Sequence, residues 1–388
     1  MRPLALRPPR IDLDHDFGWL LRCAFSFELP SSWPQSEPRV IELARVLQCA
    51  GRVGRRLEIA NVGEPRSTLR RELVADYHEN VATEALLLRA HREIARLGEQ
   101  LDVPVIPLKF AGLRLLGVGA PGNRLVSDLD LLVPKNSART FWRALLDAGY
   151  RRTYTREYPH QLETLFEPHG AVIDLHVHVP GVFVEQRKSS RDFATAEQLL
   201  ERDLVVRSSS ASWIPKRPLL AAHAISHGLL QNRSTPQTHS PLRMISDLMD
   251  LRAAEPAVLT LAEQHLAPEL GMTCATLERL CSALSSESFA RPSFADTAEQ
   301  ALLWHCLAAR VDLDYSERLR AAGLANKIRD GASLAELLDY LANLFYPGER
   351  ELEILYGPAT GPFGRARRRA KRPIDLAVRA ARRWARSR

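Results

Sequence analysis

The stretch SDLDLLV, residues 127–133, alternates polar and apolar side chains and then becomes wholly apolar. Successive side chains of a β-strand point to opposite faces, so a strand here carries Asp128 and Asp130 on one face and leucines on the other. Two carboxylates held side by side repel each other and lose hydration, and a divalent cation is the usual compensation. The stretch therefore predicts a strand that carries a Mg²⁺ site.

A second stretch, AVIDLHVHV (residues 171–179), repeats this alternation. As a strand it carries Asp174, His176 and His178 on one face. If the two strands are neighbours, Asp174 is a third carboxylate for the same site. A pair of Mg²⁺ ions needs bridging carboxylates, and such a pair activates an attacking oxygen while stabilising the leaving phosphate oxygens. The three aspartates thus indicate metal-dependent chemistry on a phosphate ester.

Phosphate groups also need cations, and three basic residues lie near these strands in the sequence. Lys109 ends a short apolar run, Arg114 lies one turn into the helix that follows, and Arg124 lies just before the acidic strand. All three can converge on a triphosphate. Gly112, near the start of the same helix, would let the backbone approach a phosphate and offer N–H groups to it.

Hydrophobic periodicity divides the chain into regions. Residues 1–100 have apolar side chains at three- and four-residue spacing and are expected to be helical, as are residues 216–355. Residues 101–215 mix short apolar strands with helices, which favours a sheet covered by helices. A Gly/Pro linker, 356–364, and a basic tail, 365–388, follow. The expected fold class is α+β, with a small mixed sheet flanked by N-terminal and C-terminal helical regions.

Shorter signals complete the predicted sheet region. Strands are expected at residues 153–158 and 163–166, an amphipathic helix capped by Ser137 at 137–150, and a hairpin at 203–215. The glycines of GVGAPG, residues 117–122, match the spacing of a dinucleotide-binding loop. They follow a helix and precede a strand, however, which is the reverse of the required order, so a turn is predicted.

The net charge of +7 belongs to the tail. Residues 365–388 contain ten Arg, one Lys and one Asp, so residues 1–364 carry −3. A mildly acidic body does not have the charge of a general nucleic-acid-binding domain. After Pro373 the apolar residues of the tail recur at helical spacing, which predicts a basic amphipathic helix starting there. An anionic membrane surface, nucleic acid and an acidic protein partner are all candidate contacts for it, beside a solvated chain end.

Composition excludes several classes of protein. The 388 residues are 45% hydrophobic and 26% charged, as in globular proteins, and no window approaches the roughly 18 consecutive apolar residues of a membrane span. Five scattered cysteines without a C-x-x-C pair indicate neither a disulfide framework nor a zinc finger. The first residues lack a sustained apolar segment, so export is not expected. We expect a cytoplasmic protein, with peripheral membrane association through the tail as an alternative.

The order of these motifs resembles the uncharacterised nucleotidyltransferase family of the polymerase-beta-like superfamily. The resemblance spans about residues 80–255 and rests on LK, a glycine-containing turn and helix, R-x-x-S-D-L-D-L-L-V, a helix ending in GY, V-I-D-L-H-V-H, and a later H-x-x-x-H (His223 and His227) followed by D-L. In one departure, Phe110 and Ala111 follow Lys109, where family members usually have glycine directly after the lysine.

The resemblance implies two bound Mg²⁺ ions, or Mn²⁺ in their place, and a nucleoside triphosphate (NTP) substrate. Catalytic and metal-binding roles fall to Asp128, Asp130 and Asp174, the last helping to activate the acceptor oxygen. Candidate nucleotide-binding and pocket residues are Lys109, Gly112, Arg124, Ser127, His160 and His176.

The sequence thus predicts a Mg²⁺-dependent nucleotidyltransferase that transfers a nucleoside monophosphate, with AMP favoured, to a hydroxyl or phosphate acceptor. The acceptor stays open among small molecules, peptides, proteins and RNA, because one metal site serves all of them. Two alternatives remain. The altered turn after Lys109 favours a catalytically degenerate nucleotide-binding or scaffold protein. The group Asp174, His176, His178 and His160 favours a metal-dependent hydrolase.

Overall fold

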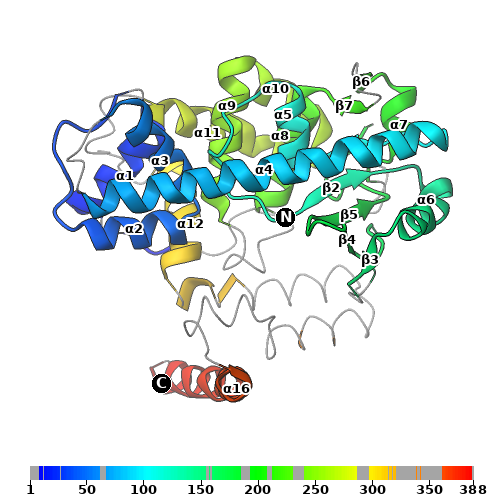
Figure 1. Ribbon diagram of the computed structural model, residues 1–388. Coiled ribbons are helices and arrows are strands. Elements are labelled where there is room, and N and C mark those ends of the chain that lie inside the picture. The colour runs from blue at the N-terminus through cyan, green and yellow to red at the C-terminus, as the bar shows by residue number, and fades with distance from the viewer. Residues whose placement is uncertain are drawn as a thin grey trace.

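One long helix connects two parts of the computed structural model (Figure 1). The structure describes residues 8–61 (apart from 12 and 27), 67–153, 157, 160–184, 193–207, 212–229, 240–285, 297–319 (apart from 313 and 317), 338, 341 and 361–386. The long helix, α4 (Thr68–Gln100), begins where the Ser67 side chain accepts a hydrogen bond from the amide of Arg70. It runs from the N-terminal helices to the sheet.

Of the three N-terminal helices, the second and third pack against α4, and the first packs on those two. They are α1 (His15–Phe25), α2 (Glu37–Val46) and α3 (Ala50–Ile59). Their buried side chains, including Trp19 and Leu57, belong to one core that continues into the C-terminal helices. The helices expected before the sheet are therefore confirmed.

The sheet is small and mixed, as predicted. Its strand order is β1-β2-β5-β4-β3, and only the β2–β5 pair is parallel. The strands are β1 (Ile106–Pro107), β2 (Leu129–Leu132), β3 (Arg151–Arg152), β4 (Leu165–Phe166) and β5 (Val172–His176). The helix α6 (Lys135–Asp147) follows β2. An α+β fold with flanking helices is thus confirmed.

One face of the sheet is apolar and lies against α4 and α6. Leu129 and Leu131 of β2 and Ile173 and Leu175 of β5 are buried in one cluster with side chains of both helices. Burying such a side chain contributes about 1.5–3 kcal/mol. Because side chains alternate along a strand, the intervening residues of β2 and β5 face the other way. Those residues include Asp130 and Asp174, two of the three aspartates of the predicted site.

The second face of the sheet looks toward α5 (Lys109–Leu115) and the C-terminal helices. The helix α8 (Arg217–Leu229) contacts α5 and packs on α9 (Pro241–Ala254). The remaining elements there are α7 (Ala196–Glu201), the strands β6 (Val205–Arg207) and β7 (Trp213–Pro215), α10 (Val258–Ala262), a 3₁₀ turn (Glu263–His265), α11 (Pro268–Ser285) and α12 (Ala298–Val311). The antiparallel pair β6–β7 confirms the predicted hairpin. The region boundaries at residues 100, 215 and 355 stay predictions.

Several predicted elements differ at their ends. The strand expected at 153–158 is β3 at Arg151–Arg152, and most of residues 154–159 lie outside the described part of the chain. The helix α6 begins at Lys135, so Ser137 lies inside it and is not its cap. Pro134, with a φ of −56°, turns the chain into the helix earlier.

The glycine-rich turn and the cysteines behave as predicted. Gly117, Gly119 and Gly122 have φ values of 68°, 70° and 76°, which non-glycine residues rarely adopt, so this segment is a turn. All five cysteines are buried free thiols. Within the described part of the chain, no helix is both long and apolar enough to cross a membrane.

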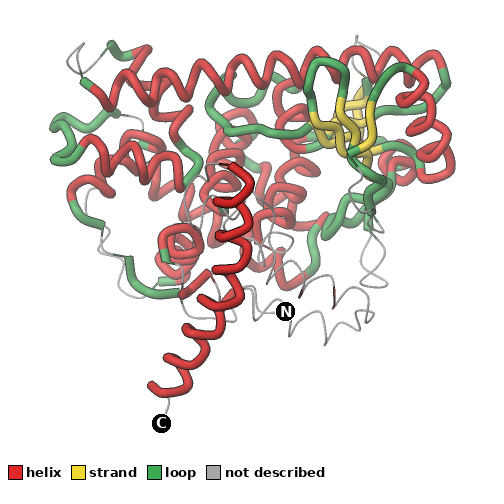
Figure 2. Tube along the Cα trace, turned by 60° about the horizontal axis from the view of Figure 1, so that its bottom comes forward, coloured by secondary structure: helices red, strands yellow, loops and turns green. Residues whose placement is uncertain are grey.

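The tail helix α16 (Gly361–Arg386) begins twelve residues earlier than predicted and includes part of the expected linker. Pro373 lies inside it. A proline inside a helix removes one hydrogen bond and costs about 3 kcal/mol. The segments before and after Pro373 are both rich in arginine and alanine, which favour helix. Figure 2 shows α16 running past the bundle toward the C-terminus.

Candidate active site

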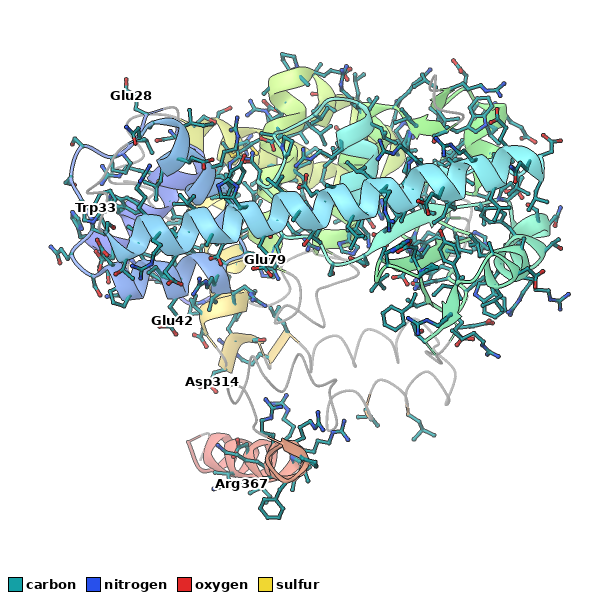
Figure 3. The ribbon with its side chains drawn as sticks, viewed as in Figure 1. Glu28, Trp33, Glu42, Glu79, Asp314 and Arg367 are labelled. Atoms are coloured by element: carbon teal, nitrogen blue, oxygen red, sulfur yellow. The ribbon has the colours of Figure 1, made fainter. Side chains whose placement is uncertain are left out.

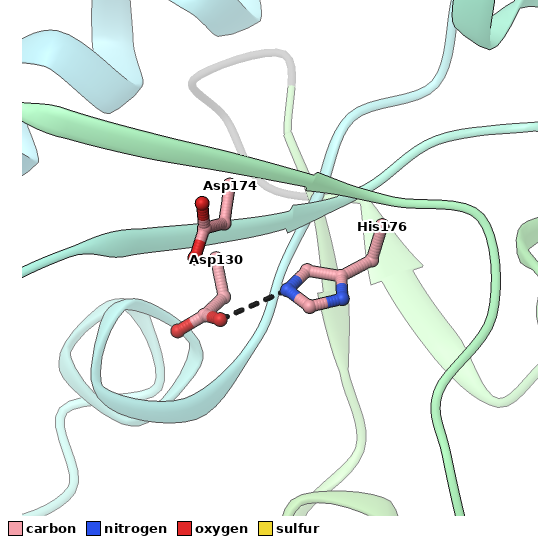
Figure 4. A group of neighbouring side chains, drawn as sticks. All are labelled: Asp130, Asp174 and His176. Carbon is pink, nitrogen blue, oxygen red and sulfur yellow. Dashed lines mark hydrogen bonds and ion pairs between the residues drawn. The ribbon is translucent and has the colours of Figure 1, made fainter. Parts of the chain in front are cut away.

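The two acidic strands are neighbours, as the sequence analysis required for a shared site. Strands β2 and β5 pair in parallel, and Asp130 is directly opposite Asp174. Equivalent side chains of paired strands share a face of the sheet, so both carboxylates lie on the side away from α4. Figure 4 shows them with His176, two residues after Asp174 on the same face.

Asp130 is the buried centre of the site, with 2% of its surface exposed. Lys109 Nζ donates to its Oδ1 at 2.6 Å, and His176 Nε2 lies 2.9 Å from the same oxygen. Burial by itself raises the pKa of Asp130, but the ammonium of Lys109 and the imidazole of His176 outweigh burial and hold it well below its usual range. Asp130 is therefore a carboxylate at neutral pH.

Asp174 behaves in the opposite way. It is half-buried and accepts a hydrogen bond from Thr164 Oγ1 at 2.5 Å. Burial, followed by the negative charges of Asp130 and Asp128, raises the pKa of Asp174 to about 6. Two paired aspartates with such different affinities for a proton are typical of a site whose carboxylates have separate roles.

A divalent cation fits this group of side chains. Asp130, Asp174 and His176 each offer a ligand atom, and these atoms lie within 4.8 Å of one another. Asp128 precedes β2 and is outside this group, yet it is near enough to raise the pKa of Asp174. Carboxylate oxygens are the ligands that Mg²⁺ and Mn²⁺ prefer, whereas imidazole suits the softer metals. Three carboxylates close together leave negative charge that such an ion would neutralise.

Lys109 reaches the site from an unusual backbone conformation. It is the first residue of α5, with a φ of 48°, a region that costs a non-glycine residue about 1–3 kcal/mol. The amide of the preceding Leu108 donates to the Asp130 carbonyl at 2.9 Å and fixes this turn against β2. The chain thus bends from β1 into α5 at one residue, which directs the ammonium at Asp130.

Arg124 lies in a pocket beside Lys109. The Arg124 side chain is 9% exposed, and its Nη1 lies 3.3 Å from Oδ2 of Asp247 on α9. Neither Nε nor Nη1 donates a hydrogen bond to any atom in the described part of the chain. The pocket is lined by residues of α5, α8 and α9 together with Arg124 and Ser240. Buried donors without acceptors are rare in proteins and indicate a place for a ligand.

A family model described as "Uncharacterised nucleotidyltransferase" matches residues 34–278, which is more than half of the chain. The chain belongs to this family. Searches of curated proteins and of solved structures found no match. The matched segment begins just before α2 and ends within α11. It contains the whole five-stranded sheet, α8 and α9.

In this nucleotidyltransferase family member, two residues near the site were not predicted as site residues. Arg243 and Asp247 of α9 are four residues apart and line the pocket with Arg124. Both lie in the run R-M-I-S-D-L, residues 243–248, whose D-L belongs to the family resemblance, and their four-residue spacing places them on one face of a helix. His223 of α8, the first histidine of the H-x-x-x-H motif, is buried among Lys109, Asp130 and His176, and burial lowers its pKa to about 3.

Two residues predicted to approach a phosphate have other partners. Arg114 donates to both carboxylate oxygens of Glu84 on α4, at 2.8 and 3.1 Å, because it projects from a different side of α5 than Lys109. The amide of Gly112 donates to the Leu108 carbonyl at 3.4 Å. A Cβ at Gly112 would lie 2.9 Å from Leu220 Cδ2, so close packing on α8 requires the glycine.

The predicted histidines and Ser127 also differ in whether they lie at the site. His160 stacks on His176 with ring centroids 6.0 Å apart, which brings it to the site. Ser127 is exposed and donates to Asp128 Oδ1 at 2.9 Å. His178 is not part of the ligand group, because β5 ends at His176, and its charged neighbours are Lys135 and Glu197.

Proposed function

We propose that this protein transfers a nucleoside monophosphate, AMP in the first instance, from an NTP to a hydroxyl or phosphate acceptor. One observation carries the proposal. Asp130 and Asp174 face each other across two parallel strands in a chain of the nucleotidyltransferase family. Small molecules, peptides, proteins and RNA all remain candidate acceptors.

Asp128, Asp130 and Asp174 would hold Mg²⁺, or Mn²⁺ in its place. When bound, such an ion supplies charge to the phosphate oxygens and lowers the pKa of an attacking hydroxyl. Asp130 suits the bridging ligand role because Lys109 and His176 keep it ionised. Its Oδ1 accepts from both partners, which orients the carboxylate before any ligand arrives.

Asp174 suits the role of proton acceptor. In the metal-free site its pKa of about 6 keeps it mostly ionised at neutral pH and gives it a higher proton affinity than an ordinary carboxylate. In the proposed reaction the acceptor hydroxyl loses its proton to Asp174, its oxygen bonds to the α-phosphorus, and the bond from the α-phosphorus to the leaving pyrophosphate breaks. Lys109, 16% exposed at its side chain, would neutralise charge on the phosphates.

The test uses NTPs labelled at the α-phosphate, incubated with the full-length protein, Mg²⁺ and a cell extract as the source of acceptors. Label from at least one NTP should enter a product, and Asp130→Asn should abolish this transfer. Asp147→Asn, at the exposed end of α6, is the matched control and should transfer label like the wild type. Absence of labelling with every NTP, in extract from the native host, contradicts the proposal.

The presence of His176 in the ligand group favours a second candidate, a metal-dependent hydrolase. Imidazole with two carboxylates is a donor set that suits Zn²⁺ as well as Mn²⁺. Thermal denaturation separates the two candidates. Stabilisation by an NTP with Mg²⁺ supports the transferase, whereas stabilisation by Zn²⁺ that no nucleotide increases supports the hydrolase. Stabilisation by an NTP without any label transfer supports the degenerate nucleotide-binding alternative.

A further inference from the structure

The pocket beside Lys109 has more positive than negative charge. Three of its lining side chains are cations, Lys109, Arg124 and Arg243, and Asp247 is the one carboxylate among the described lining residues. His227 and Ser240 add polar groups at the wall formed by α8 and α9. Because no phenylalanine, tyrosine or tryptophan is among those lining residues, the pocket suits a small anion better than a nucleobase.

The two guanidinium groups are held close together at some cost. Burial lowers the pKa of Arg243 to about 10, and Arg124 acts in the same direction, so Arg243 remains a cation at neutral pH. Burial also raises the pKa of Asp247, against the opposite influence of Arg124 and Arg243. Two buried donor nitrogens of Arg124 make no hydrogen bond within the described part of the chain. A polyanion would offset the repulsion and accept these hydrogen bonds.

Lys109 connects this pocket to the aspartates. Its Nζ is 2.6 Å from Asp130 Oδ1, and the same side chain lines the pocket. A phosphate at the aspartates and a phosphate in the pocket would therefore both contact one lysine. Consecutive phosphates of one chain satisfy this geometry.

We propose that the pocket between α5, α8 and α9 binds the β- and γ-phosphates of the nucleotide, and hence the leaving pyrophosphate, with Arg243 as a binding residue beside Lys109 and Arg124. This inference rests on the proposed transferase function and extends its site to α9. Asp247 is then a positioning residue, which orients Arg124 through its ion pair with Nη1.

The experiment measures binding of inorganic pyrophosphate to the full-length protein by calorimetry, in buffer with a chelator so that no metal contributes. Arg243→Gln should weaken binding about tenfold or more, since a charge-assisted hydrogen bond is lost. Arg243→Lys should restore part of the affinity. Arg252→Gln is the matched control, because this arginine lies on the same helix but pairs with Glu278 away from the pocket. Melting temperatures without ligand establish that each variant is folded.

Pyrophosphate affinity that is unchanged in Arg243→Gln overturns the inference, as does the absence of pyrophosphate binding by the wild type. Tighter binding of glycerol 3-phosphate than of pyrophosphate also overturns it, because the pocket would then serve a phosphorylated acceptor. Asp174→Asn separates this inference from the proposed function. That variant should lose transfer but keep pyrophosphate binding, whereas a wild type that binds pyrophosphate through Arg243 and transfers no label contradicts the transferase function alone.

A second inference concerns α16, whose apolar side faces outward. Phe363, Ile374 and Val378 are 86%, 62% and 43% exposed, and at 100° per residue they fall within about 60° of one another around the helix. Arg372, on the opposite side, is completely buried. Arg367 and Lys371 lie at about 40° and 80° on the same wheel, so cations stand among and beside these apolar side chains, and Figure 3 shows the side chain of Arg367 on this helix outside the bundle.

We infer that α16 docks this protein on an anionic lipid surface. Exposed apolar side chains with arginine and lysine beside them match a helix lying in the bilayer interface, with the apolar side chains in the acyl boundary and the cations at acidic headgroups. RNA would use the cations but gain nothing from the apolar side chains. The exposed apolar side chains therefore favour the lipid surface over nucleic acid.

Cosedimentation of the full-length protein with phosphatidylglycerol-containing vesicles tests this inference, with pure phosphatidylcholine vesicles for comparison. Binding should require the anionic lipid, fall as salt rises, and weaken about tenfold or more in Ile374→Glu. Ile59→Glu, on α3, changes an equally exposed isoleucine outside α16 and should bind like the wild type. No binding to anionic vesicles, or equal binding by Ile374→Glu, overturns the inference. RNA binding that Ile374→Glu leaves intact, without vesicle binding, assigns the helix to nucleic acid instead.

Discussion

Two buried ionic groups in this protein are built in opposite ways. Glu84 and Arg114 form a closed pair, in which two guanidinium nitrogens contact two carboxylate oxygens and a third donation goes to the Val118 carbonyl. In the candidate site, Lys109 and His176 share one oxygen of Asp130, and two buried nitrogens of Arg124 have no hydrogen-bond acceptor among the described residues.

The difference separates a structural ion pair from a binding site. The hydrogen bonds between Arg114 and Glu84 recover part of the cost of removing both charges from water, and they hold α5 against α4. Buried donors without acceptors, and a carboxyl group whose pKa is raised, lower the stability of the protein. They also provide donors that a phosphate can satisfy and a carboxylate that a cation can bind. Arg114 and Arg124, both predicted to hold phosphate, thus have different surroundings, and only those of Arg124 leave donors for a ligand among the described residues.

The largest expected effect is at Lys109. Replacement by glutamine in Lys109→Gln removes the ammonium that contacts Asp130 and reaches the pocket, and should lower the rate of nucleotidyl transfer about 10³-fold. That is about 4 kcal/mol of transition-state stabilisation. Initial rates at saturating NTP measure it. Lys216→Gln, which removes a surface partner of Asp203, should retain the wild-type rate. A Lys109→Gln rate within a few-fold of wild type would remove Lys109 from the site.

The closed pair should affect stability and not chemistry. Glu84→Gln leaves the buried Arg114 without its counter-charge and should lower the free energy of unfolding by about 3 kcal/mol. Urea denaturation measures this loss, and Glu79→Gln on the exposed side of the same helix should change it little. At a temperature where Glu84→Gln is fully folded, its transfer rate should equal that of the wild type. A large rate loss there would place Glu84 in the catalytic machinery.

Gly112 should act through packing alone. The added methyl of Gly112→Ala meets Leu220 and the Pro107 carbonyl at 2.9 Å, and overpacking of this kind costs about 1–3 kcal/mol. Unfolding experiments measure the loss, and the double variant Gly112→Ala with Leu220→Ala should recover part of it. If instead stability is unchanged and NTP affinity falls, Gly112 contacts the nucleotide as the sequence first suggested.

The smallest expected effect is the pH dependence of metal binding. Because the pKa of Asp174 is raised to about 6, a proton competes with the cation below that pH, and the carboxylate is free above it. The affinity of the nucleotide-free protein for Mn²⁺ should therefore fall about tenfold from pH 7 to pH 5. Below the pKa, each bound ion should release about one proton. Calorimetric titration measures it. Asp174→Asn should bind weakly at both pH values, and a variant that retained the pH dependence would assign the titration to another group.

The same pKa shift affects stability with a defined sign. The folded pKa of Asp174 lies above that of an unfolded aspartate, so the folded state binds more protons between about pH 4 and pH 6. In the metal-free protein the contribution of Asp174 to stability therefore decreases as pH rises through this range. The low pKa of Asp130 acts in the opposite direction, since its stabilising contacts are lost as pH falls.

The sequence by itself determined what depends on neighbouring residues in the chain. Strand alternation placed Asp128 with Asp130 and Asp174 with His176, and turn chemistry identified the glycines between 117 and 122. The order of these motifs carried the resemblance to the nucleotidyltransferase family, and the match of the family model to residues 34–278 agrees with it. These features are local, because backbone geometry fixes them within a few residues.

Only the tertiary structure decided what meets across the fold. It paired Asp130 with Asp174, directed Lys109 at them from a left-handed turn, gave Arg114 to Glu84, and brought Arg243 and Asp247 from α9 to Arg124. The reason is physical, since strand register and helix packing are set by burial of apolar faces among residues distant in sequence. A basic residue in the sequence therefore indicates charge, while its partner, and so its function, depends on packing.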